Sequence, residues 1–479
     1  MRIQSFCFIL LTAALFGACK KDYLSVNEVN PNQTQSPPIN GLLAAVTYQT
    51  GINYFRAGDF TSYYVQYLAS PNVGGPSDIY ENADRSSFWF NTSITGTNPF
   101  GGVYNTVMDG RVLLQQARAA NAYEHMGVVR VTEAMNMSLM IDLFGDVPYS
   151  EAFNPAIFTP KYDKAEDIFN SCLVLLDSAI VDFQKQNPPI KLDAASDLIH
   201  AASVPRWIKT AHAIKARLLN RLSKLPTYNP TAILAEVGLA YANNNEDAQV
   251  TKFVTRNPWG QVAQNNAQNL LDGWMSEQFI DALNGTSFGV VDPRLKLIAT
   301  TTAAGTYKGT PNGKGRTGSG TTRDESYLSV TGFYSKPDAP LLLATYAEMK
   351  FIEAEASFAT DRARSYRAYL AGIEAHMDKL GVPAGEKTAY LSNPAVAVGE
   401  ANLTRALIFK EKYVAMFLHP ESWTDARRFD YAYKDFTLPN GALLPTYIRR
   451  AGYPSSELSR NAGNVPNITA LSERLWWDK

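Results

Sequence analysis

The fold of this protein depends on a short stretch that reads Ile141-Asp142-Leu143-Phe144-Gly145-Asp146-Val147-Pro148-Tyr149-Ser150-Glu151-Ala152. The apolar, methionine-rich segment before it is typical of a buried helix. Gly145 is suited to end that helix, because a residue without Cβ adopts positive φ without a clash. Pro148 cannot continue a helix and holds the preceding residue in extended geometry. Asp142 and Asp146 flank the turn, where short carboxylates accept hydrogen bonds from free backbone N–H groups. The stretch therefore predicts a sharp corner between a buried helix and an extended segment.

The same stretch resembles a hallmark of the SusD/RagB family of nutrient-binding outer-membrane lipoproteins. Further resemblances occur in the family's order along nearly the whole chain. They are Asn30-Pro31-Asn32, Asp292-Pro293-Arg294-Leu295 and the segments 305–313, 344–356, 410–417 and 421–428. The resemblance implies a mainly α fold, in which tetratricopeptide-like helical hairpins form a scaffold and long irregular insertions bind the ligand. It also implies a SusC-like TonB-dependent transporter as the partner.

The composition is that of a globular protein without a nucleic-acid footprint. The chain has 479 residues, of which 46% are hydrophobic and 19% are charged. Its formal net charge is −1, which excludes the strongly basic surface that nucleic-acid binding requires. Aromatic residues make up 11% of the chain and include 25 tyrosines, whose flat rings and polar tips suit polar ligands with apolar faces.

The N-terminus has the features of a targeting segment. Arg2 precedes a short apolar run from 6 to 16 that cannot span a bilayer about 30 Å thick. Small residues before Cys19 resemble a lipobox, so we expect a signal peptide at 1–18 and a lipid on Cys19. The alternative is an ordinary secretory signal with an incidental cysteine. Cys7 leaves with the signal, and Cys172 lies on the apolar face of a predicted helix, where a lone cysteine is usually buried.

We expect a linker at 19–36 and a single α-helical domain at 37–479. Helical pairs are predicted at about 100–245 and 340–431, and irregular insertions at about 70–99 and 285–338. Residues 261–283 are predicted as one helix that ends at Asn284-Gly285. The helix predicted at 205–225 carries a basic stripe, for which a solvent-exposed face is the expectation. The stripe consists of Lys209, Lys215, Arg217, Arg221 and Lys224.

Two motif matches and the histidines do not indicate catalysis or a metal. Gly285-Thr286-Ser287-Phe288-Gly289 fits the nucleophile elbow, but a predicted helix rather than a strand precedes it. The G-x-G-x-x-G match at 313–318 lies in a Gly/Thr-rich tract without a βαβ unit. None of the five histidines has another histidine at ligand spacing, so no zinc site is expected and no metal ligand is assigned.

Carboxylate pairs keep a hydrolase open as an alternative. Glu348, Glu353 and Glu355 lie on one predicted helix, and Asp142 and Asp146 lie at the corner. Glycosidases use two carboxyl groups roughly 5–9.5 Å apart. Such pairs also arise by chance in a chain of this size, and ion pairs are the simpler interpretation. No cofactor is expected.

The candidate ligand site is an aromatic cluster in the first insertion. Between Tyr48 and Tyr104, 13 of 57 residues are aromatic, about twice the average of the chain. Ring faces stack on the C–H faces of sugars, and amides bind sugar hydroxyls. The predicted ligand contacts are Tyr80, Phe88, Trp89 and Asn91, with Tyr307 from the second insertion as the opposite wall. The alternative for the loop aromatics is a small core that holds a long loop in place.

These observations predict a non-enzymatic, cell-surface lipoprotein of the outer membrane. It would capture an oligosaccharide, or alternatively an oligopeptide, and deliver it to a SusC-like TonB-dependent transporter. A surface glycan hydrolase and a helical adhesion or scaffold protein are the other candidates. The sequence does not identify the ligand.

Overall fold

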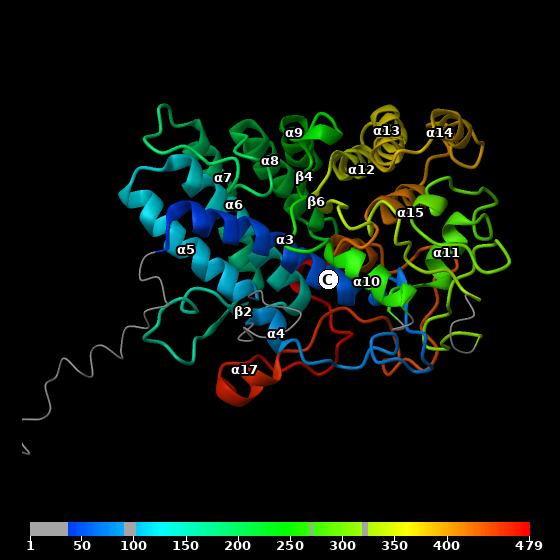
Figure 1. Cartoon of the computed structure of the whole chain (residues 1–479), viewed down its shortest axis with the longest axis horizontal. Coiled ribbons are helices and arrows are strands. Elements are labelled where there is room, and N and C mark those ends of the chain that lie inside the picture. Colours follow the sequence, from blue (N-terminus) through cyan, green and yellow to red (C-terminus); the bar gives the residue numbers. More distant parts are fainter. Residues whose placement is uncertain (1–36, 91–101, 269–271, 319–323) are drawn as a thin grey trace, which may run out of the picture.

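The structure of this chain, a computed structural model, describes residues 37–90, 102–268, 272–318 and 324–479. It is mainly α-helical, as the sequence predicts (Figure 1). The longer helices are α3 (Ile39–Tyr64), α5 (Val103–Ala119), α6 (Tyr123–Phe144), α7 (Ala165–Gln184), α8 (Val204–Arg221), α9 (Pro230–Leu239), α12 (Tyr346–Ser357), α13 (Arg362–Leu380) and α15 (Arg405–Ala415). The shorter ones are α4 (Ser86–Trp89), α10 (Pro258–Ala267), α11 (Glu277–Leu283), α14 (Ala384–Leu391), α16 (Glu421–Arg428), α17 (Ser455–Arg460), η1 (Asn244–Glu246), η2 (Leu295–Leu297) and η3 (Trp476–Asp478).

Strands are few and short within the described residues. Three antiparallel pairs occur, and each joins segments that are apart in the sequence. They are β1 (Leu68–Ala69) with β5 (Trp274–Met275), β2 (Val147–Pro148) with β3 (Tyr162–Asp163), and β4 (Ala248–Val250) with β6 (Leu341–Ala344). These pairs fasten the irregular segments to the helical body rather than form a layer of their own.

Consecutive helices pack as hairpins and build the scaffold. The closest pairs are α5 with α6, α6 with α7, α8 with α9, and α12 with α13. In Figure 1 they run from the left side along the upper side, while irregular segments occupy the lower right. Helix α3 packs against α5 and α6. No helix in the described part of the chain has both the length and the apolarity to cross a membrane.

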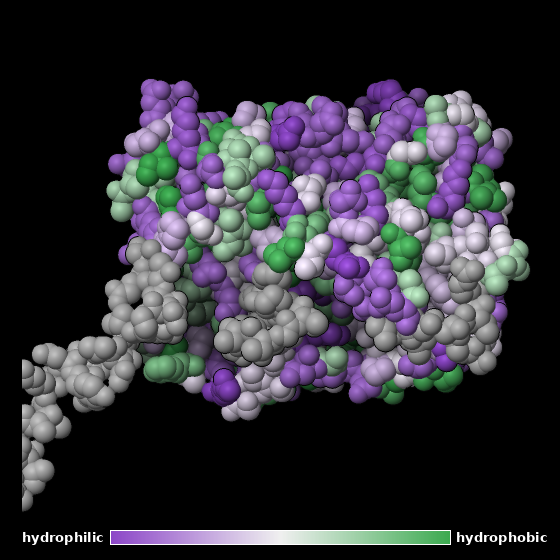
Figure 2. Space-filling model, in the orientation of Figure 1, coloured by the Kyte–Doolittle hydropathy of each residue, from purple (hydrophilic) through white to green (hydrophobic). Residues whose placement is uncertain are grey.

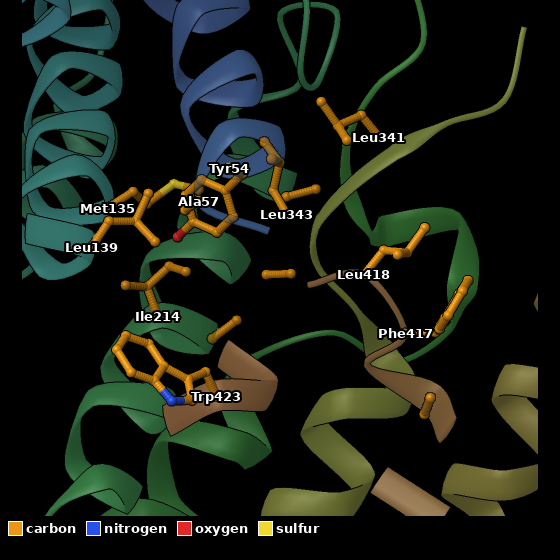
Figure 3. Close-up of a cluster of buried hydrophobic side chains, with 14 of the residues drawn as sticks. Tyr54, Ala57, Met135, Leu139, Ile214, Leu341, Leu343, Phe417, Leu418 and Trp423 are labelled. Carbon is orange, nitrogen blue, oxygen red and sulfur yellow. The ribbon is translucent and has the colours of Figure 1, made fainter. Parts of the chain in front are cut away.

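The core is built where α3, α6, α8, β6 and α16 meet. Tyr54, Met135, Ile214 and Trp423 come from four of these helices and pack together (Figure 3). Helix α3 passes close to the backbone of the segment between α15 and α16, since a Cβ on Gly58 would lie 2.3 Å from the carbonyl oxygen of Leu418. On the face shown in Figure 2, hydrophobic residues are scattered among hydrophilic ones rather than gathered into one patch.

The predicted corner forms as expected at Gly145. Helix α6 ends at Phe144, and Gly145 has φ 82° and ψ −128°. Pro148 lies in β2, directly after the turn. Asp146 accepts a hydrogen bond of 2.8 Å from the backbone N–H of Ala165 at the start of α7. The prediction that Asp142 does the same is wrong: its carboxylate is 2% exposed and lies 2.6 Å from the guanidinium of Arg221.

The C-terminal part of the chain satisfies the free carbonyl groups at the end of α6. The last turn of a helix leaves four carbonyls without intrahelical partners. Arg427 donates to the Asp142 carbonyl at 2.6 Å, Arg450 donates to the Phe144 carbonyl, and the Ala451 N–H donates to the Leu143 carbonyl at 2.7 Å. The corner is therefore completed by residues that lie far away in the sequence.

Two local predictions are wrong. Residues 261–283 do not form one helix, because the chain leaves α10 and passes through β5, which pairs with β1, before α11 begins. The basic stripe of α8 is not fully exposed, since Arg217 and Arg221 are 4% and 1% exposed. They are buried against Glu348 and Glu421, at 2.6 and 2.8 Å, because carboxylates from α12 and α16 are packed over this face. Cys172 is buried and free, as predicted.

Candidate ligand-binding site

Five polar or charged residues from three parts of the chain meet beside the C-terminal half of α3. Arg56, Asp59 and Tyr63 lie on one face of this helix, at spacings of three and four residues. Helix α4 packs on α3 and brings Arg85, and the pairing of β1 with β5 brings Asp272. Asp59 is within electrostatic range of Arg56, Arg85 and Asp272, and Tyr63 is within range of both aspartates. We call these five half-buried residues the charged cluster.

The charges of the cluster are not paired with one another in the described part of the structure. No ion pair joins Arg56 or Arg85 to Asp59 or Asp272 among the described residues. Arg56 donates to the Ser87 hydroxyl at 3.1 Å, but its other terminal nitrogen, Nη1, is buried without a hydrogen-bond partner. The Nη2 atom of Arg85 has no partner either. Buried charges in folded proteins are usually paired, so the cluster retains unused hydrogen-bonding capacity.

Aromatic rings hold the two arginines in place. The guanidinium of Arg85 lies over the ring of Phe60, 4.3 Å from its centroid, and that of Arg56 lies 5.8 Å from the centroid of Phe88. The two rings pack edge to face with centroids 6.0 Å apart. These cation–π contacts fix the arginines without using their N–H groups. The rings therefore position the two guanidinium groups without satisfying Nη1 of Arg56 or Nη2 of Arg85.

Burial changes the charge of Asp59. Burial, reinforced by the nearby carboxylate of Asp272, raises the pKa of Asp59 to about 6, against the opposing effect of Arg85 and Arg56. Asp59 is thus ionised at neutral pH but is protonated within the mildly acidic range. Its carboxylate can accept hydrogen bonds from ligand hydroxyls where the arginines cannot.

Three of the predicted ligand contacts are buried. Tyr80, Phe88 and Trp89 are 2%, 3% and 1% exposed. Trp89 packs against Tyr104 and Phe144, with ring centroids 5.4 and 5.2 Å away. The ring faces of these residues are therefore not available to a ligand in this structure. The alternative interpretation, a small core that holds the loop, is the arrangement observed.

The other predicted site residues have different outcomes. Asn91 and Cys19 lie outside the described residues. Tyr307 is half-buried and lines a groove of about 460 Å³, which we call the Tyr307 groove. None of the residues of the charged cluster lines this groove. The residues that line the groove include Val290, Val291, Asp292, Pro293, Lys296, Tyr307, Glu386 and Tyr390.

A third feature is a polar groove of about 410 Å³ next to α11. Its lining includes Gln66, Glu277, Asp281 and Asp435. Gln66 and Asp435 have φ angles of 54° and 62°, a region that residues other than glycine rarely adopt. Burial, with a smaller contribution from Asp435, raises the pKa of Asp281, although its hydrogen bond with Asn284 opposes the shift. Among the described residues, no group of three or more His, Cys, Asp or Glu side chains is placed to hold a metal ion.

The carboxylates considered for hydrolysis belong to ion pairs. Glu353 contacts Lys350 at 2.9 Å and Arg364 at 2.7 Å. Glu355 lies 2.7 Å from Lys412 and 2.8 Å from Arg428, both of which lower its pKa to about 2 although burial opposes them. Ser287 of the nucleophile-elbow match follows α11 rather than a strand. The cations beside Glu353 and Glu355 lower the pKa of both carboxyl groups, so neither is a protonated general acid at neutral pH.

Sequence reasoning found only part of the cluster. It pointed to the first insertion, where Arg85 and Phe88 lie, but it attached the function to the rings. Asp59 and Asp272 escaped notice because single carboxylates are common, and only the folded chain brings them together. The spacing of Arg56, Asp59 and Tyr63 was the available signal: a charged face on an otherwise buried helix.

The fold is a scaffold of helical hairpins with irregular segments attached to it, and the charged cluster lies where α3 meets two of these segments. A protein-family model described as "Starch-binding associating with outer membrane" (SusD-like) matches residues 31–454. The chain therefore belongs to the SusD-like family. No curated protein sequence matches it.

Solved structures share the fold at low sequence identity. A SusD homologue from Bacteroides uniformis has a TM-score of 0.74 at 18% identity, with 93% of this chain and 100% of that chain covered. A SusD/RagB family protein from Bacteroides thetaiotaomicron has a TM-score of 0.73 at 21% identity, with 92% of this chain and 99% of that chain covered. A chitin-binding SusD homologue from Flavobacterium johnsoniae has a TM-score of 0.73 at 20% identity, with 92% of this chain and 98% of that chain covered.

Proposed function

We propose that this protein is a cell-surface binding lipoprotein that captures an oligosaccharide and delivers it to a SusC-like TonB-dependent transporter. The observation that carries the proposal is the match to a starch-binding, outer-membrane-associated family over most of the chain. The fold shared with a chitin-binding SusD homologue supports a glycan over a peptide as the ligand. In this proposal the lipid on Cys19 anchors the protein, and residues 20–36 act as the tether.

The charged cluster is the proposed site of ligand contact. A sugar hydroxyl both donates and accepts hydrogen bonds, so one diol can donate to the Asp59 carboxylate and accept from Arg85. Hydrogen bonds to charged groups are each worth about 1.5–3 kcal/mol, more than those between neutral groups. Among the residues that the structure describes, the cluster makes no ion pair with the scaffold, so a ligand can contact its charges without breaking such a pair.

The proposal includes no catalytic step. Glu353 and Asp146, the carboxylates on which a hydrolase would most readily depend, have structural partners. The bound glycan is expected to leave the protein intact and enter the transporter.

Binding measurements on purified protein test the proposal. Calorimetry with maltoheptaose, chitohexaose and a neutral hexapeptide distinguishes glycan from peptide, and an array of plant, fungal and microbial polysaccharides widens the search. We expect a glycan to bind, and Arg85→Met to weaken this binding by about tenfold. Arg118→Met, which removes an exposed arginine from α5, is the matched control and should change nothing.

Four outcomes would contradict the proposal. Binding of the hexapeptide alone would favour the oligopeptide alternative. Shorter products in chromatography of the recovered glycan would favour the hydrolase. If the protein does not co-purify with a TonB-dependent transporter from its native outer membrane, delivery to such a transporter is contradicted. If labelled palmitate does not appear on Cys19, the lipid anchor is contradicted.

A further inference from the structure

We propose that the Tyr307 groove is a second glycan-binding site, which acts together with the charged cluster so that one protein holds two parts of the same polymer. This inference rests on the proposed glycan capture but goes beyond it, because it assigns a separate subsite and a preference for long chains. The groove and the cluster share no lining residue.

One wall of the groove exposes apolar surface that the described chain leaves uncovered. Val291 is 65% exposed, and Val290, Pro293 and the ring of Tyr307 are half-buried beside it. Apolar surface left in water is unfavourable, and a pyranose ring covers it with its C–H face. The Tyr307 ring adds a flat stacking surface and a hydroxyl that can form a hydrogen bond.

The floor of the groove is rigid. Asp292 and Tyr390 line it and are 1% and 3% exposed. Arg294 holds Asp292 at 2.5 Å, while the Tyr390 hydroxyl donates to Glu411 at 2.8 Å and accepts from Lys410 at 2.7 Å. A floor fixed by such contacts loses little conformational freedom when a ligand binds, which favours affinity.

The rim of the groove carries one ion pair that a neutral ligand can replace. Lys296 and Glu386 lie 2.6 Å apart and are 47% and 42% exposed. Exposed pairs of this kind contribute little to stability, so separating them has a small cost. A sugar hydroxyl can accept from Lys296 and another can donate to Glu386. Since the two charges cancel, the rim favours an uncharged ligand over a phosphate or a charged peptide.

The groove is large enough for a small ligand, and a second site would raise the affinity of the protein for long polymers. A volume of about 460 Å³ lies within the range of small-molecule sites, roughly 300–1,000 Å³. When one polymer reaches both sites, the second contact is intramolecular, and the combined affinity rises by a factor on the order of 10²–10⁴ if the geometry permits. The protein would then prefer polymers to the short products of their degradation.

Calorimetry with short and long glycans tests this inference. The probes are maltoheptaose and chitohexaose as oligosaccharides, and amylopectin and glycol chitin as polymers. For the glycan that binds, we expect two oligosaccharides per wild-type protein and one per Tyr307→Ala protein. Tyr307→Ala should also lower the affinity for the polymer at least tenfold. Glu386→Gln, which keeps the shape of an exposed side chain, should weaken the second site without affecting folding.

The control is Tyr123→Ala, which removes another half-buried tyrosine, at the start of α6, and should leave both sites intact. Binding of a single oligosaccharide by the wild type, or an unchanged stoichiometry and polymer affinity in both Tyr307→Ala and Glu386→Gln, would overturn the second site and leave the proposed function standing. If the wild type binds none of the four probes and no glycan of the array, the proposed function fails and this inference fails with it.

Discussion

Two groups of charged side chains in this protein have opposite surroundings. In the scaffold, Arg221 contacts Asp142 at 2.6 Å and Glu421 at 2.8 Å, and Arg294 lies between Asp292 and Glu411. These charges are almost completely buried, and each has an opposite charge beside it. In the charged cluster, the arginines and aspartates are half-buried and no ion pair joins them in the described residues.

The difference matches a structural role for the first group and the binding role that we propose for the second. A fully buried charge is tolerated only with a close partner, because its desolvation is otherwise too unfavourable. The scaffold charges meet this condition and link α6, α8 and α16. The cluster charges are half-buried and lie against the rings of Phe60 and Phe88, and in the proposed site they would exchange water for a ligand. Substitutions in the two groups should therefore affect different measured quantities.

The largest effect is expected at Arg221. The substitution Arg221→Met leaves Asp142 and Glu421 buried near each other without their shared cation. Removing one partner of a buried ion pair typically costs about 3–5 kcal/mol in the free energy of unfolding. Urea unfolding at pH 7 measures the loss.

A pH comparison sharpens this test. Burial, partly offset by Arg221, raises the pKa of Asp142 to about 7, whereas the two nearby arginines lower the pKa of Glu421 to about 2 despite its burial. Asp142 accepts a proton at pH 5, which relieves the repulsion, so the loss in Arg221→Met should be smaller at pH 5 than at pH 8. Arg118→Met should stay within about 0.5 kcal/mol of the wild type. A loss below about 1 kcal/mol in Arg221→Met would contradict the structural role of the pair.

The sequence predicted the parts of the fold that depend on local geometry. Gly145 and Pro148 define the corner through their own backbone preferences, and the helical pairs predicted at about 340–431 include the observed pair of α12 and α13. The prediction that the basic stripe is exposed was wrong for the opposite reason. In the sequence Arg217 and Arg221 resemble exposed residues, and only the folded chain packs Glu348 and Glu421 over them. Charges whose partners come from other helices cannot be assigned to surface or core from periodicity alone.

The candidate site shows the same limit more strongly. The aromatic density of the first insertion led to a ligand-site prediction, but rings are equally suited to a small core and to a ligand surface. Burial decides between these roles, and burial of Trp89 depends on Phe144 and Tyr453, from distant segments. Asp59 and Asp272 are brought together only by the pairing of β1 with β5, for which two-residue strands leave no readable pattern.

A moderate effect of opposite sign is expected at Asp59. Its pKa in the folded protein, about 6, is higher than the unfolded value of 3.8, so the ionised carboxylate destabilises the fold at pH 7. After allowance for solvent screening of a half-buried group, Asp59→Asn should raise the free energy of unfolding by about 1 kcal/mol. The same substitution should lower glycan affinity about tenfold, because a charge-assisted hydrogen bond becomes a neutral one. Asp338→Asn, at an exposed position, is the control for both measurements. A stability loss together with unchanged affinity would place Asp59 in the scaffold group instead.

The smallest effect is expected from pH acting on the wild-type site. As the pH falls from 7.5 to 5.0 it passes the pKa of Asp59, about 6, and the carboxylate takes up a proton. The protonated group can donate one hydrogen bond but loses the negative charge that attracts ligand hydroxyls. Glycan affinity should therefore fall several-fold over this interval, while Asp59→Asn, already neutral, should bind with nearly the same affinity at both values. In the scaffold, Glu421, with a pKa of about 2, stays ionised throughout, whereas Asp142, with a pKa of about 7, also takes up a proton in this interval. The comparison with Asp59→Asn separates the effect of Asp59 from that of Asp142. If the affinity of Asp59→Asn falls as steeply as that of the wild type, the titrating group lies elsewhere, and the unpaired carboxylate of the cluster does not contact the ligand.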